Sequence, residues 1–154
     1  MMKPTKIILH CSDTKDSGTV SWGAIRTYHT NTIGWKDIGY HFGIELVGSY
    51  YEILLGRLLT EPGAHCEGHN ADSIGICFVG AFDTEAVPAK QWDKGIKLVR
   101  WLMTIFNLTN RDVYGHREFN KQKTCPGTKF NLNTFRVQLI ESDIIGIIHP
   151  ERDI

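Results

Sequence analysis

The chain has 154 residues, 42% hydrophobic and 22% charged, which is the composition of a soluble globular protein. Seventeen Lys and Arg residues balance seventeen Asp and Glu residues, so the charge argues against nucleic acid or an anionic membrane as a partner. No apolar run reaches the roughly 20 residues of a membrane span, so we expect no membrane insertion. We expect a single domain over residues 1–154, with a core at about 6–141 and an apolar tail at 142–154.

The start of the chain and the cysteines bear on the compartment. Only three apolar residues separate Lys6 from His10, whereas a secretory signal needs an apolar run of roughly 7–15 residues. We therefore expect a protein that is cytoplasmic as synthesised. The four cysteines show no C-x-x-C pair and act singly in a reducing compartment, with Cys11 and Cys77 expected in the core.

The first part of the chain predicts a buried strand and then a helix. Lys6–Cys11 is a short apolar run with His10 near its C-terminal end. Ser21 suits the N-cap of the helix. One face of that helix would point to the core and carry Trp22, Ile25, Tyr28 and His29.

The middle of the chain predicts a β-hairpin and a central strand. Tyr40–Val47 and Tyr50–Leu55 flank the tight turn Gly48-Ser49, as the two strands of a hairpin do. Leu59–Asn70 contains Pro and Gly residues typical of an irregular surface loop. The near-continuous apolar run Ser73–Gly80 indicates a strand covered on both faces.

The last part predicts two helices around a short strand. A long helix extends from Pro88 to about Asn107, and its apolar stripe comprises Trp92, Ile96, Val99, Met103 and Phe106. Asp112–Gly115 is a short strand, Phe130–Glu141 a second helix, and Ile144–His149 an apolar segment without an obvious partner. Together the elements predict an α/β fold in which a central mixed β-sheet is flanked by helices in three layers.

Three side chains are candidates for a metal site. His10 and His116 each follow a predicted strand, and strand exits are where α/β folds place ligands. Cys125 lies on a loop that Pro126 stiffens. These residues would supply His, His and Cys to one zinc ion and leave a fourth position open. Spacing alone leaves hydrogen-bonded histidines and a buried thiol as alternatives.

Six segments of the chain carry a family resemblance, in register over roughly residues 6–135. They are Ile8–Thr14, Gly34–Phe42, Gly63–His65, Asn70 with Ser73–Ile76, Gly115–Glu118 and Cys125–Gly127. Together they resemble the type 2 N-acetylmuramoyl-L-alanine amidases, a family that includes phage lysis amidases and resembles the animal peptidoglycan recognition proteins. The resemblance implies a zinc amidase fold with one Zn²⁺ per chain and a groove for peptidoglycan or a muropeptide above it.

The resemblance also implies roles for individual residues. The zinc ligands fall on His10, His116 and Cys125, the catalytic tyrosine on Tyr40, and the lysine of the phage branch on Lys123. A cysteine as third ligand favours the phage and recognition-protein branches, because many recycling amidases carry an aspartate there. Without the resemblance, an ordinary strand aromatic and a solvated loop lysine are the favoured interpretations of Tyr40 and Lys123.

Four further residues are candidates for contact with the substrate in the groove. A sugar-bearing, amide-rich substrate needs hydrogen-bonding groups and an aromatic surface. Each candidate has a purely structural role as its alternative. They are Trp35, Arg57, His65 and Asn70. His41 alternates with Tyr40 along the predicted strand and is expected to point away from the zinc.

The predicted function is zinc-dependent hydrolysis of the amide bond between N-acetylmuramic acid and L-alanine by a phage or prophage endolysin, acting on the wall after release. The alternatives are a recognition module without catalysis and a cytoplasmic muropeptide-recycling amidase. A thiol protease using Cys125 and His116 is less favoured. The resemblance to phage amidases permits a protein partner such as RNA polymerase, bound through Met1–Lys6 or the apolar tail of an expected monomer.

Overall fold

Strands and helices alternate along the chain in the computed structural model, which describes residues 2–15 and 21–148, without the side chains of 142–148. The predicted α/β class is confirmed. In chain order the elements are β1 (Lys6–Cys11), α1 (Trp22–Thr27), the π-helical turn η1 (Tyr28–Thr32), β2 (Phe42–Val47), β3 (Tyr50–Leu55), β4 (Ser73–Phe78), α2 (Ala89–Phe106), the 3₁₀ turn η2 (Asn110–Asp112), β5 (Val113–Gly115), α3 (His116–Phe119) and α4 (Leu132–Ile148).

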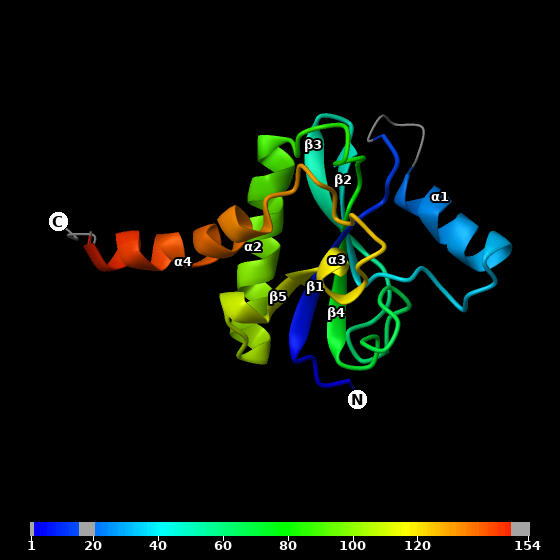
Figure 1. The fold of residues 1–154 in the computed structure, drawn as a ribbon, viewed down its shortest axis with the longest axis horizontal. Helices are drawn as coiled ribbons and strands as arrows, with labels where there is room; N and C mark the ends of the chain where they lie inside the picture. Colours follow the sequence, from blue (N-terminus) through cyan, green and yellow to red (C-terminus); the bar gives the residue numbers. More distant parts are fainter. Residues whose placement is uncertain (1, 16–20, 149–154) are drawn as a thin grey trace.

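The strands of the described chain form one mixed sheet in the order β3-β2-β4-β1-β5. β2, β4, β1 and β5 are parallel, whereas β3 pairs antiparallel with β2, which confirms the predicted hairpin. β4 lies in the middle and all of its residues are buried, as its apolar sequence predicts. Figure 1 shows α2 and α4 on one side of the sheet and α1 on the other, so the molecule has three layers.

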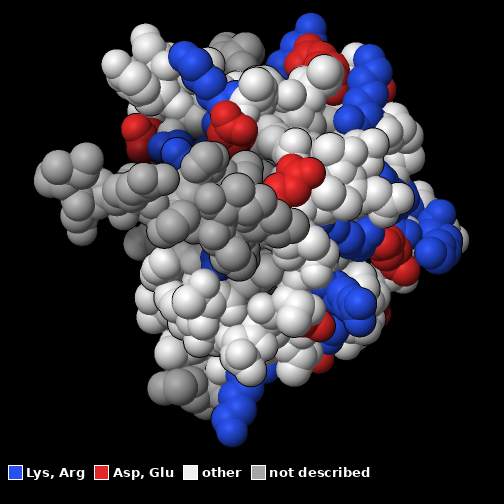
Figure 2. Space-filling view, turned by 90° about the vertical axis from the view of Figure 1, so that its left-hand side faces the viewer, with Lys and Arg blue, Asp and Glu red and all other residues white. Residues whose placement is uncertain are grey.

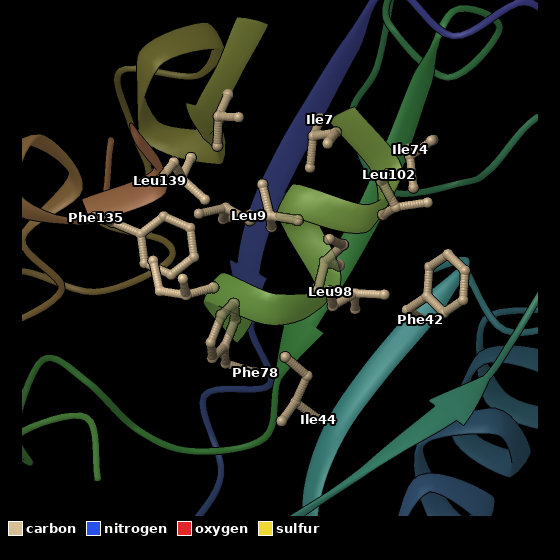
Figure 3. Close-up of a cluster of buried hydrophobic side chains, with 14 of the residues drawn as sticks. Ile7, Leu9, Phe42, Ile44, Ile74, Phe78, Leu98, Leu102, Phe135 and Leu139 are labelled. Atoms are coloured by element: carbon tan, nitrogen blue, oxygen red, sulfur yellow. The ribbon is translucent and has the colours of Figure 1, made fainter. Parts of the chain in front are cut away.

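The larger hydrophobic cluster lies between the sheet and the layer of α2 and α4. Figure 3 shows Leu9 of β1 and Phe78 of β4 close to α2 and to Phe135 of α4. The ring of Phe78 meets those of Phe130 and Phe135 edge-on, with centroids 5.1 and 6.1 Å apart. This packing fixes the sheet whose strand ends carry the histidines described below.

Helix α2 buries a broader face than its sequence pattern predicts. Ile96 and Val99 of the expected stripe are buried, but its other three members are only partly buried and lie at the edge of the core. Trp92, one of the three, donates from Nε1 to Gln138 Oε1 at 2.6 Å and so faces α4. The helix packs closely against the sheet at Gly95, where an added Cβ atom would lie 2.3 Å from the ring of Phe78. The other residues on this face are Gln91, Leu98 and Leu102.

The predicted helix is α-helical in α1 and continues directly as the π-helical turn η1, and one member of its predicted core face is exposed. Trp22 and Ile25 are buried in a second cluster against the sheet, and His29 of η1 is also buried. Tyr28 is 56% exposed, so its predicted position in the core is wrong. It follows Trp22 by six positions and therefore lies about 120° away around the helix.

The N-terminal segment is not the free arm that a protein partner was expected to use. Met2 packs in the main core, and its backbone N–H donates to Thr60 O at 3.4 Å. The backbone N–H of Thr5 donates to Asp72 O at 2.8 Å. Burial and these hydrogen bonds hold the segment against the body of the protein.

Helix α4 begins two residues later than predicted, and its backbone continues to Ile148, so part of the predicted apolar tail is helical. The side chains of 142–148 and all of 149–154 lie outside the described residues, and the polymerase partner stays a prediction. Figure 2 looks onto this side of the molecule and shows side chains of both charges interspersed. Among the described helices, none has the length and apolar character needed to cross a membrane.

Candidate metal centre

Two histidines meet because of the register between β1 and β5. Leu9 pairs with Gly115 across these parallel strands, so the next residue of each chain segment, His10 and His116, emerges at the same edge of the sheet. Their ring centroids lie 4.7 Å apart. His10 is only 2% exposed, whereas His116 is partly open to the surface. The fold therefore confirms that the two strand exits bring these side chains together.

Cys125 reaches the histidine pair from the loop that follows α3. Its sulfur lies 3.7 Å from Nδ1 of His10. The backbone N–H of Cys11 points to the same sulfur at 3.4 Å and is placed to stabilise a thiolate. Cys11 is half-buried, packs against the main core and also borders the groove, whereas Cys77 is fully buried as predicted. The last residue of a strand leaves the sheet's core, which explains the difference.

Arg117 holds the loop that carries Cys125. Its backbone N–H donates to Cys125 O at 2.8 Å. Its guanidinium donates to three further backbone carbonyls along the loop, which are those of Thr124, Gly127 and Phe130. Because an arginine fork has five donors in a fixed plane, one side chain sets the path of several loop residues.

Asp83 holds the outer side of the same loop. One carboxylate oxygen accepts from Thr124 Oγ1 at 2.6 Å, and the other accepts from the backbone N–H of Thr128 at 2.7 Å. These hydrogen bonds, that of Thr124 foremost, lower the pKa of Asp83. The loop is thus attached on one side to Arg117 and on the other to the segment after β4.

The donor atoms fit a zinc ion. Those of His10, His116 and Cys125 all lie within 4.8 Å of one another. With Zn–N near 2.0–2.1 Å and Zn–S near 2.3 Å, a tetrahedral site separates nitrogen from sulfur by about 3.6 Å. The observed distance from His10 Nδ1 to Cys125 Sγ is 3.7 Å. Two imidazoles and one thiolate also leave a fourth position for water or substrate, as catalytic zinc requires.

The protonation states of these residues suit metal binding. Burial, followed by the nearby His65 and His116, lowers the pKa of His10 well below its usual 6.5, and burial followed by Lys123 lowers that of His116. Both imidazoles are therefore neutral, which is the form that binds metals. The interaction with the Cys11 thiol, followed by burial, raises the pKa of Cys125 in the metal-free chain. The thiol must consequently release its proton when a metal binds.

A groove of about 950 Å³ lies over the three ligands. Tyr40 and Lys123 both line it. The Tyr40 ring lies 5.2 Å from that of His10, and burial, followed by nearby cysteines, raises the pKa of Tyr40 well above 10, so the phenol keeps its proton. Other lining residues include Asp13, Trp35, Ala64, Glu67, Gly68, Asn70, Phe119, Asn120, Lys121, Gln122 and Thr124.

Two of the predicted substrate residues lie where a substrate can touch them. Trp35 lines the groove and is 36% exposed, with its ring 4.8 Å from that of His29. Asn70 also lines it, and its Oδ1 accepts the backbone N–H groups of His65 and Cys66 at 2.8 and 2.9 Å. Asn70 therefore shapes the loop wall in addition to facing the groove.

The other two predicted substrate residues have structural contacts, although His65 also lines the groove. Arg57 is not among the described residues that line the groove, because its guanidinium donates to the backbone carbonyls of Asp37, Ile38 and Pro62. His65 is only 8% exposed, and its Nδ1 lies 3.0 Å from Nε2 of His10. His41 is fully buried, accepts from Gly75 N and lies outside the groove lining, as expected of a neighbour of Tyr40. A histidine behind a ligand leaves no signal in the spacing of a single sequence.

Two histidines and a cysteine that could hold a metal ion lie at the floor of a groove in an α/β domain, and this donor set is of the class that catalytic zinc sites use. The profile of the N-acetylmuramoyl-L-alanine amidases matches residues 1–128, and the chain belongs to this family. The endolysin of Enterobacteria phage T3 is 43% identical over 143 residues, which cover 89% of each chain. The predicted family and the prediction of an amidase enzyme are therefore confirmed.

Solved structures of similar proteins agree with the fold. The N-acetylmuramoyl-L-alanine amidase LysC from Clostridium intestinale URNW has a TM-score of 0.79 and 32% identity, covering 90% of this chain and 86% of its own. The Y78F mutant of Drosophila PGRP-LB, in complex with tracheal cytotoxin, has a TM-score of 0.71 and 26% identity, covering 84% of this chain and 78% of its own. Amidases and recognition proteins thus share this architecture.

Proposed function

We propose that the chain is a zinc-dependent endolysin that hydrolyses the amide bond between N-acetylmuramic acid and L-alanine in peptidoglycan. The proposal depends on one observation: the donor atoms of His10, His116 and Cys125 converge within 4.8 Å at the floor of the groove. Similarity to a phage endolysin over 89% of both chains supports the role in wall degradation. The complex of the PGRP-LB mutant with tracheal cytotoxin supports a peptidoglycan ligand in the groove.

The three proposed ligands would contribute differently to metal binding. Bound zinc supplies a Lewis acid that polarises a carbonyl and lowers the pKa of a water toward about 7. His10 and His116 bind through neutral imidazoles, and Cys125 adds one negative charge that its contact with the Cys11 amide favours. Both histidines line the groove, His10 as a buried residue and His116 as a partly exposed one, so a metal that they hold would be accessible from the groove.

We assign the catalytic contacts with the reacting amide to Tyr40 and Lys123. The phenol of Tyr40 keeps its proton and so can donate a hydrogen bond to the carbonyl oxygen as negative charge develops there. The ammonium group of Lys123 lies in the groove lining two residues before Cys125 and adds positive charge to the same region. Removing one such donor costs about 3–4 kcal/mol of transition-state stabilisation.

Substrate contacts away from the scissile bond fall to Trp35 and Asn70. The partly exposed indole of Trp35 offers an apolar surface on which a sugar or a peptide side chain can pack. The Asn70 amide supplies hydrogen-bonding groups to the groove wall. These contacts orient the substrate, and we expect their loss to raise KM more than it lowers kcat.

Metal content and wall hydrolysis, measured on one sample, test the proposal. Purified protein is expected to contain about one zinc per chain, to clear a suspension of purified cell walls and to release L-alanine amino groups. His116→Ala and Cys125→Ala are expected to lose both zinc and activity. His69→Ala is the matched control, because His69 packs on Phe119 outside the ligand set and should keep both. Normal zinc content and activity in Cys125→Ala would contradict the ligand assignment.

The same assays separate the alternative functions. A recognition module would bind walls without releasing amino groups, and a recycling amidase would cleave soluble muropeptides much faster than intact walls. A thiol protease would keep its activity after treatment with a chelator. We expect chelation to abolish activity and added zinc to restore it.

A further inference from the structure

We propose that His65 is a positioning residue that fixes the tautomer of His10, so that the unprotonated Nδ1 of His10 faces the metal position. This inference rests on the proposed zinc site. It concerns a residue of the groove wall that was expected to contact the substrate. The evidence for this inference is the direction of the hydrogen bonds around His65.

A chain of polar contacts extends from the ligand into the protein. His10 Nε2 lies 3.0 Å from His65 Nδ1, and the other nitrogen of His65, Nε2, lies 3.4 Å from Ser73 Oγ. Ser73 Oγ in turn donates to the backbone carbonyl of His69 at 2.5 Å. Ser73 is fully buried, so these neighbours determine how its hydroxyl is oriented.

The carbonyl at the far end fixes the direction of every bond in the chain. A carbonyl only accepts, so the single hydrogen of the Ser73 hydroxyl is committed to His69 O. Ser73 Oγ can then only accept from His65, which requires a hydrogen on His65 Nε2. A neutral imidazole carries one hydrogen, so Nδ1 of His65 is an acceptor. It must accept from Nε2–H of His10, which leaves Nδ1 of His10 unprotonated.

That free nitrogen is the one that faces the other ligands. Nδ1 of His10 lies 3.7 Å from the sulfur of Cys125, the distance that suits two ligands of one zinc ion. The opposite tautomer would place a hydrogen on Nδ1, in the direction of the metal position. It would also oppose two unprotonated nitrogens, those of His10 and His65, at 3.0 Å.

The protein is built to hold the His65 ring in this place. A Cβ atom at Gly75 would lie 2.5 Å from Cδ2 of His65, and one at Gly63 would lie 2.4 Å from the same atom. The absence of side chains at these two positions lets the ring lie flat against the backbone of β4 and of the preceding loop. Asn70 completes the arrangement by accepting the backbone N–H of His65.

Tautomers can be read directly in the zinc-loaded chain by ¹⁵N NMR of histidine rings. We expect His65 to carry its hydrogen on Nε2, and His10 to carry its hydrogen on Nε2 with Nδ1 bound to the metal. A hydrogen on Nδ1 of either ring would overturn the proposal. The measurement needs no variant, so it does not depend on how well an altered chain folds.

Zinc affinity tests the energetic consequence. His65→Leu removes the acceptor, and zinc affinity is expected to fall by about 10–100-fold. His65→Asn returns a carbonyl oxygen near the position of Nδ1 and is expected to recover most of this loss. Gln91→Leu is the matched control, because Gln91 is a buried polar residue outside the groove lining and its amide donates to the backbone carbonyls of Ile44 and Val79. It should destabilise the fold while zinc affinity stays at the parental value.

The outcomes distinguish this inference from the proposed function. A parent chain that binds no zinc would contradict the proposed function, and the His65 tautomer in that chain would still test the hydrogen-bond chain. A parent that binds zinc, together with a His65→Leu variant of equal affinity, would overturn the inference and leave the zinc amidase intact. Equal losses in His65→Leu and His65→Asn would also overturn it.

Discussion

The candidate metal centre combines two regions that hold its proposed ligands in different ways. His10 and His116 are fixed by the register of β1 and β5, and their backbones belong to a buried sheet. Cys125 is fixed by a loop whose shape depends on the side chains of Arg117 and Asp83. We therefore expect the two histidines to stay side by side as long as the sheet is folded. Changes in the loop, in contrast, can displace the Cys125 sulfur while the sheet stays folded.

Acidification is expected to have the largest effect, and it acts on the region around the strands. Burial, followed by His41, lowers the pKa of His65 from 6.5 to about 3. Below pH 6.5 His65 binds a proton in the unfolded chain but stays neutral in the folded chain. Its contribution to the free energy of unfolding is therefore fully present above pH 6.5 and is lost as the pH falls toward 3. The loss from His65 is on the order of 5 kcal/mol. Urea unfolding of the metal-free chain between pH 7 and 3 measures it, and a flat profile would contradict the burial of neutral histidines.

Truncation of the core under the sheet comes next. Phe78→Ala removes a fully buried ring of β4 and is expected to lower the free energy of unfolding by about 3–5 kcal/mol. Both regions should fail together in a single transition, because the loop has no support without the sheet. Phe106→Ala, at the partly buried end of α2, is the control with a smaller loss. Zinc that stays bound at urea concentrations above the unfolding midpoint of the sheet would contradict the dependence of the loop on the sheet.

Loss of the arginine is expected to affect the loop alone. Arg117→Met removes the donors to Thr124, Gly127 and Phe130, which costs about 1–3 kcal/mol of stability. We expect zinc affinity to fall about tenfold while far-ultraviolet circular dichroism stays unchanged. Arg111→Met, on the surface turn η2, is the control for removal of one positive charge. Equal zinc affinity in both variants would show that the loop needs no such support.

The smallest expected effect is that of the exposed carboxylate. Asp83→Asn weakens the hydrogen bonds to Thr124 and Thr128 but keeps the size of the side chain. The pKa of Asp83 is lowered in the folded chain, so its contribution is present at neutral pH and is lost as the pH falls through that lowered value. We expect faster amide hydrogen exchange at Thr128 and little change in the unfolding midpoint. Unchanged exchange would remove Asp83 from the support of the loop.

Periodicity in the sequence was sufficient for the elements that bury whole faces. The apolar run of β4, the glycine turn of the β2–β3 hairpin and the long helix α2 each follow one rule of local structure. These rules failed where contacts with other elements determined which face of a helix is buried. Gly95 has no side chain and so lets α2 pack closely against Phe78. Tyr28 lies on a side of its helix that does not face the core.

The candidate site was predicted in part for a similar reason. His10, His116 and Cys125 lie in sequence segments that resemble the family, and the structure places their donor atoms together. The position of His65 behind His10 depends on Ser73, on the His69 carbonyl and on two glycines, which meet only in the folded chain. Arg57 stays a prediction as a substrate contact, and its hydrogen bonds to backbone carbonyls could not be predicted because such acceptors carry no sequence signal.

The separation of the ligands along the chain has a consequence for when activity can arise. His10 and Cys125 are 115 positions apart, so most of the polypeptide must be synthesised before His10 can lie beside the other two proposed ligands. An interrupted or clipped chain that lacks the loop after α3 therefore has an incomplete set of proposed ligands, and we expect it to bind no zinc.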